Sequence, residues 1–248
     1  MFEDPQALAL IGVVILLAGF VKGVLGLGLP TIAVGLLGLV MAPLQAAALL
    51  TVPNLVTNVW QLSAGPGLRA LLARLGPMLL GVCLGTFVAA GFAAGIDLPW
   101  APAFLGVALI VYAALGLASL KMRVAPSAER WLGPAVGVLT GGITVATGVF
   151  VVPAVPYLQA LGFEKDDLVQ ALGVSFLVST VALALSLAAT GVFPWTLAGS
   201  SVVALAPALV GMWAGQHARA RISNRAFRLC FLGGLLGLGL YLVTRTLA

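Results

Sequence analysis

The side chains of this sequence that are best suited to chemistry are polar groups set inside long apolar stretches. Lys22 is the one charged residue deep within such a stretch. A lysine at the centre of a bilayer costs about 2.5–3.5 kcal/mol on insertion scales, so its charge needs a partner or water. Two roles stay open for Lys22: it binds an anion inside the protein, or it only reaches the lipid headgroups with its long side chain.

Polar residues also form stripes at helical spacing. Thr51, Asn54, Asn58 and Gln61 follow one another at intervals of three, four and three, which places them on one face of a helix. The serines at positions 175, 179 and 186 form a second stripe. Lipid excludes amides, so both faces should turn inward, either to line a pathway or to hold helices together by hydrogen bonds. The pairing of the two stripes favours the lining role.

Two glycine-rich breaks precede short apolar segments, GFVKGVLGLGLP at 19–30 and GGITVATGVFVVP at 141–153. Gly26 and Gly28 permit a sharp reversal, and Pro30 suits the first turn of a helix that we expect from Thr31. In the second break, Thr147 before Gly148 should cap the next helix with its hydroxyl. The free N–H groups and positive dipole ends of two such helices would face the middle of the membrane, where they prefer an oxyanion.

The composition shows what must position these groups. The chain has 248 residues, 62% of them hydrophobic and 8% charged, against about 25% charged in an ordinary soluble domain. Lipid must therefore be its solvent, and no room remains for a catalytic domain outside the membrane. We expect ten apolar segments, at about 7–21, 31–41, 44–64, 75–96, 100–120, 131–143, 149–161, 168–189, 195–214 and 227–243. The second and seventh are too short to cross the bilayer core.

The order of break, short helix, polar helix and small-residue helix occurs twice. In this register Asn54 corresponds to Ser179, and after one further small slip the run Pro77, Gly81, Gly85 corresponds to Pro207, Gly211, Gly215. We therefore expect two transmembrane repeats, 1–124 and 125–248, each with a broken short-helix pair and three spanning helices. An odd number of crossings per repeat would invert the second repeat. The predicted fold is an all-α polytopic membrane protein of about 8–10 transmembrane segments, a plan found in secondary transporters.

The cations set the orientation. The net charge is +5 and the pI about 9.8, but the basic residues lie between apolar segments, which indicates positive-inside topology rather than nucleic-acid binding. With alternating segments, these cations fall on one side: Arg69, Arg74, Lys121, Arg123, Arg130, Lys165, Arg219, Arg221, Arg225 and Arg228. Both termini should face outward. The acidic start of the chain does not resemble a secretory signal, so we expect the first segment to be retained.

Several residue types are placed where they cannot support catalysis. All seven acids lie in predicted termini or loops, and His217 is the only histidine. Cys83 and Cys230 lack the spacing of a metal or redox pair. No GKS or GKT nucleotide-binding motif occurs. We therefore expect no enzyme activity, no metal and no cofactor.

The two breaks resemble those of the TauE/SafE sulfite exporter family, and the likeness covers nearly the whole chain. It is carried by Gly19, Gly23, Gly26, Gly28, Pro30, Gly137, Gly141, Gly142, Gly148, Pro153 and the stretch Gly173-Val174-Ser175. The first turn reads Gly-Leu-Gly-Leu-Pro instead of the usual glycine triplet. The resemblance implies export of sulfite, sulfonates or related organosulfur anions across a bacterial inner membrane, by alternating access at a midplane site.

The predicted partners are a small anionic substrate and membrane lipid, with no nucleic acid; whether the protein forms a homo-oligomer stays open. Two alternatives remain, a transporter of another small solute on the same scaffold and a non-transporting membrane subunit of a larger complex. The predicted substrate-binding residues are Lys22, Gly26, Gly28, Thr31, Asn54, Asn58, Thr144, Thr147, Gly148, Ser175 and Ser179.

Overall fold

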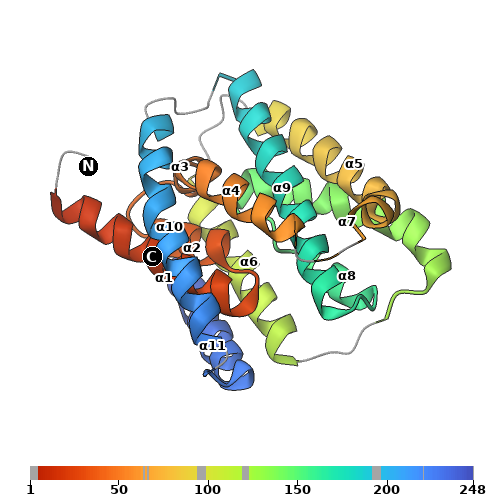
Figure 1. Ribbon diagram of the computed structural model, residues 1–248. Coiled ribbons are helices and arrows are strands. Elements are labelled where there is room, and N and C mark those ends of the chain that lie inside the picture. Colours follow the sequence, from red (N-terminus) through yellow and green to blue (C-terminus); the bar gives the residue numbers. More distant parts are fainter. Residues whose placement is uncertain are drawn as a thin grey trace.

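The computed structural model describes residues 5–63, 65, 67–93, 99–118, 123–191, 197–219 and 221–247. Within these ranges the regular elements are eleven α-helices, and no strand occurs. They are α1 (Pro5–Leu25), α2 (Leu29–Leu37), α3 (Pro43–Leu49), α4 (Thr51–Leu62), α5 (Leu68–Ala93), α6 (Ala101–Ala118), α7 (Pro126–Thr147), α8 (Ala154–Ala160), α9 (Lys165–Ala189), α10 (Ala198–Ala218) and α11 (Asn224–Leu247) (Figure 1).

Five of the described helices, α1, α5, α6, α9 and α11, contain stretches long and apolar enough to cross a membrane. Large apolar side chains also cover the outside of the bundle. Leu80, Phe92 and Val203 are each more than 70% exposed, which a water-facing surface would not tolerate in such numbers. The prediction of an all-α polytopic membrane protein is confirmed.

The predicted third segment, 44–64, is not one helix. It divides into α3 and α4 at Leu50, whose φ of −89° and ψ of 2° leave the helical range. The cause is Pro53, which has no N–H to donate to the carbonyl of Leu49 and whose ring crowds that carbonyl. The freed N–H of Val52 donates instead to Ser201 Oγ on α10, at 3.0 Å. The prediction of a continuous segment was wrong here.

The two short helices exist, but the second differs from its prediction. As predicted for a helix after Pro30, α2 has a proline in its first turn, and Gly28 precedes it with φ of 112°. By contrast, α8 begins only at Ala154, after an irregular stretch that ends in a turn, and has no side-chain cap. Thr147 uses its hydroxyl locally: it donates to the carbonyl of Ile143 at 2.7 Å and accepts from the N–H of Val149 at 3.2 Å. The predicted cap by Thr147 was wrong.

Glycines bring two pairs of long helices into backbone contact. In the α1–α10 pair, a Cβ on Gly19 would meet the carbonyl oxygen of Ala208, and one on Gly23 that of Met212. The α5–α7 pair repeats this geometry, because Gly137 faces the carbonyl of Met78 in the same way. At these positions only glycine fits, so each pair is packed too closely for its members to slide past one another.

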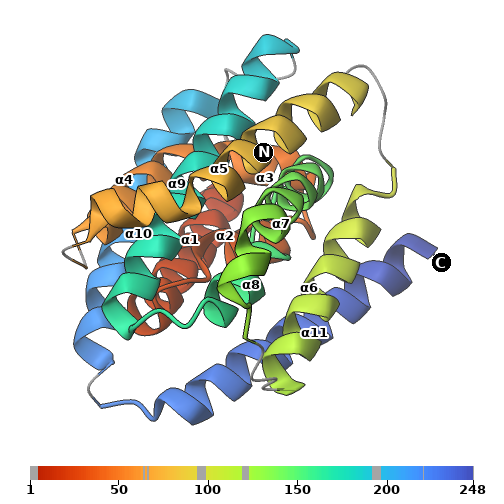
Figure 2. The same cartoon turned by 90° about the vertical axis from the view of Figure 1, so that its right-hand side faces the viewer.

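The packing partners follow one scheme. The first helix of each half packs on the long proline-containing helix of the other half, α1 on α10 and α7 on α5. Further extensive contacts join α6 with α11, α4 with α9, α5 with α9 and α4 with α10. Figure 2 shows α11 running alongside α6 at the edge of the bundle. Exchanging the two halves leaves this list of pairs unchanged. Of the glycine runs in the long helices, Gly81, Gly85, Gly211 and Gly215 lie at these contacts, whereas Gly233 and Gly237, for which we also expected close helix packing, meet no atom within 4 Å.

Candidate functional site

Lys22 lies in the last turn of α1 and is only 2% exposed. Its ammonium nitrogen Nζ donates to Thr57 Oγ1 at 2.9 Å and to Asn58 Oδ1, both on α4. The side chain therefore points into the bundle rather than toward lipid headgroups. Of the two roles considered from the sequence, the one in which Lys22 only reaches the membrane surface does not fit this placement.

The charge of Lys22 has no acidic partner. Among the described residues the only ion pair joins Arg74 to Glu129, at 2.6 Å. Thr57 and Asn58 solvate the ammonium with neutral oxygens, which leaves its charge uncompensated. An ammonium group carries three N–H donors, and two are used, so a donor remains for another acceptor.

Buried polar atoms without partners surround this region of α4. Asn54 Oδ1, Asn58 Nδ2 and Gln61 Oε1 are buried and have no hydrogen-bond partner among the residues that the structure describes. The same is true of Thr31 Oγ1, Ser175 Oγ and Ser179 Oγ. Native proteins leave few such atoms, and each calls for an explanation such as water or a ligand. Asn58 contributes unpaired amide donors close to the Lys22 ammonium, a combination that suits an oxyanion.

The first glycine break is attached to the same face of α4. Gln61 Nε2 donates to the carbonyl oxygen of Gly26 at 2.5 Å. Gly26 and Gly28 have φ values of 78° and 112°, in the left-handed range that favours glycine. Gly173 on α9 packs directly against Gln61 and the backbone of Asn58. The structure thus places the break, Lys22 and the amide stripe in one neighbourhood.

The second break lies elsewhere. Gly148 contacts Pro43 and Ala47 in α3, whereas Gly26 contacts Gln61 near the end of α4. Thr144 and Thr147 are buried, but their hydroxyls donate to backbone carbonyls one turn earlier, at 2.7 Å each. This is the usual behaviour of threonine inside a helix. The second break therefore contacts the start of the α3–α4 segment, and the first break contacts its end. The structure does not bring the two breaks together around one point.

One contact of Lys22 was missed from the sequence. Thr57 is fully buried and accepts from Lys22, while its own hydroxyl donates to the carbonyl of Pro53 at 2.6 Å. In the sequence it stands beside Asn58 rather than on the predicted stripe. Its signal was its spacing of three from Asn54, since helical neighbours at that spacing share a face.

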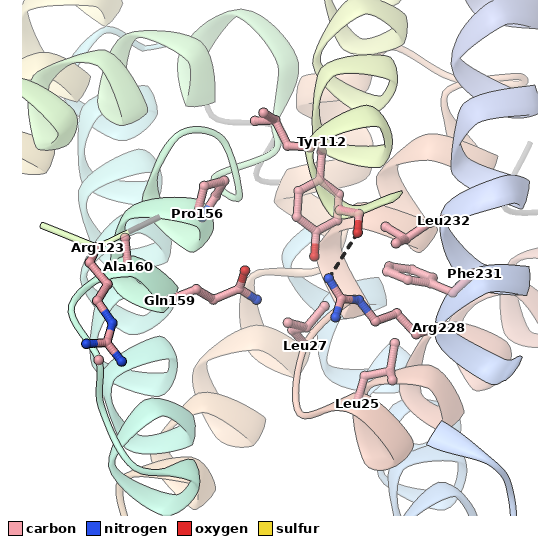
Figure 3. A pocket seen from close by; sticks show the side chains of 13 residues that line it. Leu25, Leu27, Tyr112, Arg123, Pro156, Gln159, Ala160, Arg228, Phe231 and Leu232 are labelled. Atoms are coloured by element: carbon pink, nitrogen blue, oxygen red, sulfur yellow. Dashed lines mark hydrogen bonds between the residues drawn. The ribbon is translucent and has the colours of Figure 1, made fainter. Parts of the chain in front are cut away.

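A cavity of about 620 Å³ opens beside the first break, and we call it the basic cavity. Leu25 and Leu27, on either side of Gly26, form part of its wall. Figure 3 shows Arg228 on one side, Arg123 on the other and Gln159 between them. Arg228 Nη2 donates to the carbonyl oxygen of Gly116 at 3.0 Å. The sequence predicted both arginines only as topology signals, because nothing in their spacing places them near the break.

A second cavity, of about 340 Å³, lies at the other end of the α6–α11 pair. It is lined by the turn after α2, by Pro102 at the start of α6 and by Arg245 near the end of α11. Arg245 donates to the carbonyl oxygen of Leu39 at 2.8 Å. The two cavities therefore lie beyond opposite ends of α2, and α6 and α11 contribute to the walls of both.

A helical bundle of this kind, with an apolar exterior, a buried cation among unpaired amides and cavities at two ends, is a polytopic membrane protein whose interior suits a polar solute. The comparison with protein families agrees. Residues 11–242 match the family described as sulfite exporter TauE/SafE, so the chain belongs to that family, as the sequence resemblance predicted. No curated protein and no solved structure shows a significant match. In the part of the chain that the structure describes, no group of three metal-binding side chains gathers.

Proposed function

We propose that the protein is a secondary transporter that exports a small oxyanion, sulfite or an organosulfonate, across the bacterial inner membrane. Membership of the TauE/SafE family supports the organosulfur class of substrate. The site supports an anion independently of the family. No cofactor is part of the proposal.

The observation that carries this proposal is the environment of Lys22. Its two hydrogen-bond partners are neutral oxygens, and the amide group of Asn58 beside it has unpaired donors. An arriving oxyanion would neutralise the ammonium and accept these hydrogen bonds together, whereas a cation would be repelled. Charge-assisted hydrogen bonds of this type are about twice as strong as neutral ones. Thr31, Asn54, Ser175 and Ser179 supply further unpaired groups in the interior.

Alternating access is supported by the way the helices are paired. The α1–α10 and α5–α7 pairs are closed by glycine contacts and should move as rigid units. We infer that the repeats 1–124 and 125–248 are duplicated, because the contact scheme is unchanged when the halves are exchanged. We infer that they are inverted from the odd number of crossings that the sequence predicts in each repeat. The cavities at the two ends of α2 would then be the entrances that open in turn.

The test is transport by the purified protein alone. Liposomes containing it should take up [³⁵S]sulfite faster than empty liposomes, and unlabelled sulfite or a small sulfonate should compete while uncharged glycerol should not. Failure to move any anion without another subunit would favour the alternative of a non-transporting membrane component. Competition by cations instead of anions would favour a transporter of a different solute.

A further inference from the structure

We propose that the basic cavity is a second binding site, one that takes organic anions with a compact oxyanion head joined to an apolar tail. This inference rests on the transport function proposed above and adds to it a second place at which an organic anion binds. Nothing in the Lys22 site itself requires it, because Lys22 is not part of the cavity wall.

The charge of the cavity suits an anionic head. Arg123 and Arg228 both line it, and no aspartate or glutamate is among its described lining residues. Arg228 is held in place by its bond to the Gly116 carbonyl, and the remaining donors of its five-donor guanidinium are available. Gln159 adds an amide between the two arginines (Figure 3). The planar guanidinium group of arginine can donate two parallel hydrogen bonds, which match the geometry of oxyanions with two or three oxygens.

The rest of the wall suits a hydrocarbon tail. Tyr112 and Phe231 meet edge to face with ring centroids 6.4 Å apart, and Leu27 and Leu232 continue the apolar surface. Aromatic and leucine side chains around a few polar groups are the usual lining of a small-molecule site.

The size of the cavity separates an organic anion from sulfite. Sulfite has four non-hydrogen atoms and fills only about two to three water volumes of ~30 Å³ each. The basic cavity measures about 620 Å³, within the range of about 300–1,000 Å³ typical of sites for larger organic ligands. An anion with several carbon atoms uses both the arginines and the aromatic wall, and inorganic sulfite uses only the arginines.

The cavity also connects to the Lys22 site through named contacts. Its wall includes Leu25 and Leu27, and the carbonyl of Gly26 between them is bonded to Gln61. Gln61 lies one turn beyond Asn58, which accepts the hydrogen bond of Lys22. A sulfonate bound in the basic cavity would therefore lie beside the turn at Gly26, which is hydrogen-bonded to α4, the helix that holds the Lys22 ammonium.

The experiment measures binding of 1-butanesulfonate to the full-length protein in phosphatidylcholine nanodiscs by calorimetry. The double variant Arg123→Gln/Arg228→Gln should weaken binding by about ten- to a hundredfold, the effect of losing charged hydrogen bonds. Arg123→Lys/Arg228→Lys keeps the positive charge and should retain most of the affinity, which separates loss of charge from misfolding. The matched control, Arg221→Gln/Arg225→Gln, removes two exposed arginines of the same region that do not line the cavity. Equal affinities for the first variant and this control would overturn the proposal.

A phospholipid headgroup offers the same anionic chemistry, so a second arm uses nanodiscs that contain phosphatidylglycerol. If the cavity takes a free sulfonate, 1-butanesulfonate should bind equally well in both lipids. If phosphatidylglycerol abolishes binding in the wild type, the site belongs to lipid and the proposal is overturned.

The Lys22→Gln variant keeps the two proposals distinguishable. It should lose sulfite transport and still bind 1-butanesulfonate, because the cavity does not include Lys22. Sulfite transport at the wild-type rate in Lys22→Gln would overturn the proposed role of Lys22 alone. Wild-type affinity for 1-butanesulfonate in the Arg123→Gln/Arg228→Gln variant would overturn the cavity proposal alone.

Discussion

The ammonium of Lys22 on α1 donates a hydrogen bond to the side-chain oxygen of Asn58 on α4, deep inside the bundle. This bond holds a buried cation with a neutral group, so the charge is solvated without being cancelled. Burying this uncompensated charge lowers the stability of the protein when no anion is bound, and a bound anion removes that cost. That balance is suited to a site that must take up its ligand and release it again.

The first prediction concerns the charge of Lys22. Lys22→Gln keeps much of the length and polarity, but it should weaken sulfite binding by about ten- to a hundredfold, because a charged hydrogen bond contributes about 1.5–3 kcal/mol. Expression should change little, since the variant removes the cost of an uncompensated charge in the membrane. Calorimetry on the purified protein measures the affinity. Arg69→Gln, which removes an exposed cation, should leave the affinity unchanged.

The second prediction supplies the missing counter-charge. Asn58→Asp places a carboxylate against Lys22 and should abolish sulfite binding, because the cation is then neutralised within the protein. The folded protein should be at least as resistant to heat as the wild type, since the ammonium gains a charged partner. Asn58→Leu removes the amide without adding charge and should weaken binding less. Sulfite affinity in Asn58→Asp equal to that of the wild type would show that the substrate does not meet this pair.

Most of the fold could be predicted from hydropathy, because a spanning helix needs a long apolar stretch that the sequence displays directly. The division at Leu50 was missed although its cause, Pro53, was visible. Lys22 and Asn58 were both predicted, since a charge and an amide stripe stand out among apolar residues. The basic cavity could not be predicted, because it is lined by segments distant in the chain, α6, α8 and α11 with the turn after α1. Only tertiary packing brings these together.

The second break does not make the contacts that the similarity of the two halves led us to expect. The local glycine pattern is alike in both halves, but Gly26 is bonded to Gln61 whereas Gly148 packs on Pro43 and Ala47. The partner of each break is set by the tertiary packing of the helices around it, which the local glycine pattern does not determine. The outward placement of both termini stays a prediction, and Met1 and Ala248 lie outside the described residues.

The third prediction concerns the glycine contacts. A Cβ on Gly85 would meet the carbonyl oxygen of Val138 across the α5–α7 pair, so Gly85→Ala must push the helices apart. We expect a loss of about 1–3 kcal/mol, the usual cost of overpacking, seen as a lower melting temperature in detergent. Gly91→Ala, on the same helix, meets no atom within 4 Å and should be neutral or slightly stabilising. Equal melting temperatures for the two variants would contradict the close packing.

The fourth prediction uses cysteine labelling in a background with Cys83 and Cys230 replaced by serine. Leu27→Cys should react with a small water-soluble thiol reagent, because Leu27 lines the basic cavity. Val145→Cys should react far more slowly, since Val145 is 3% exposed and lines neither of the two cavities described above. Both positions would react if both breaks reached one site in the middle of the membrane, as the sequence led us to expect. Equal labelling rates at the two positions would support a shared site for the two breaks and would contradict the difference in access that the basic cavity predicts.

The most direct measurement is the rate of [³⁵S]sulfite uptake into liposomes by three matched proteins, the wild type, Lys22→Gln and Arg69→Gln. Each variant removes one positive charge, one from the buried site and one from an exposed position. A buried anion site at Lys22 predicts uptake by the wild type and by Arg69→Gln at similar rates, with at least a tenfold slower rate for Lys22→Gln when sulfite is limiting. Uptake by Lys22→Gln at the wild-type rate would contradict the central role of this residue.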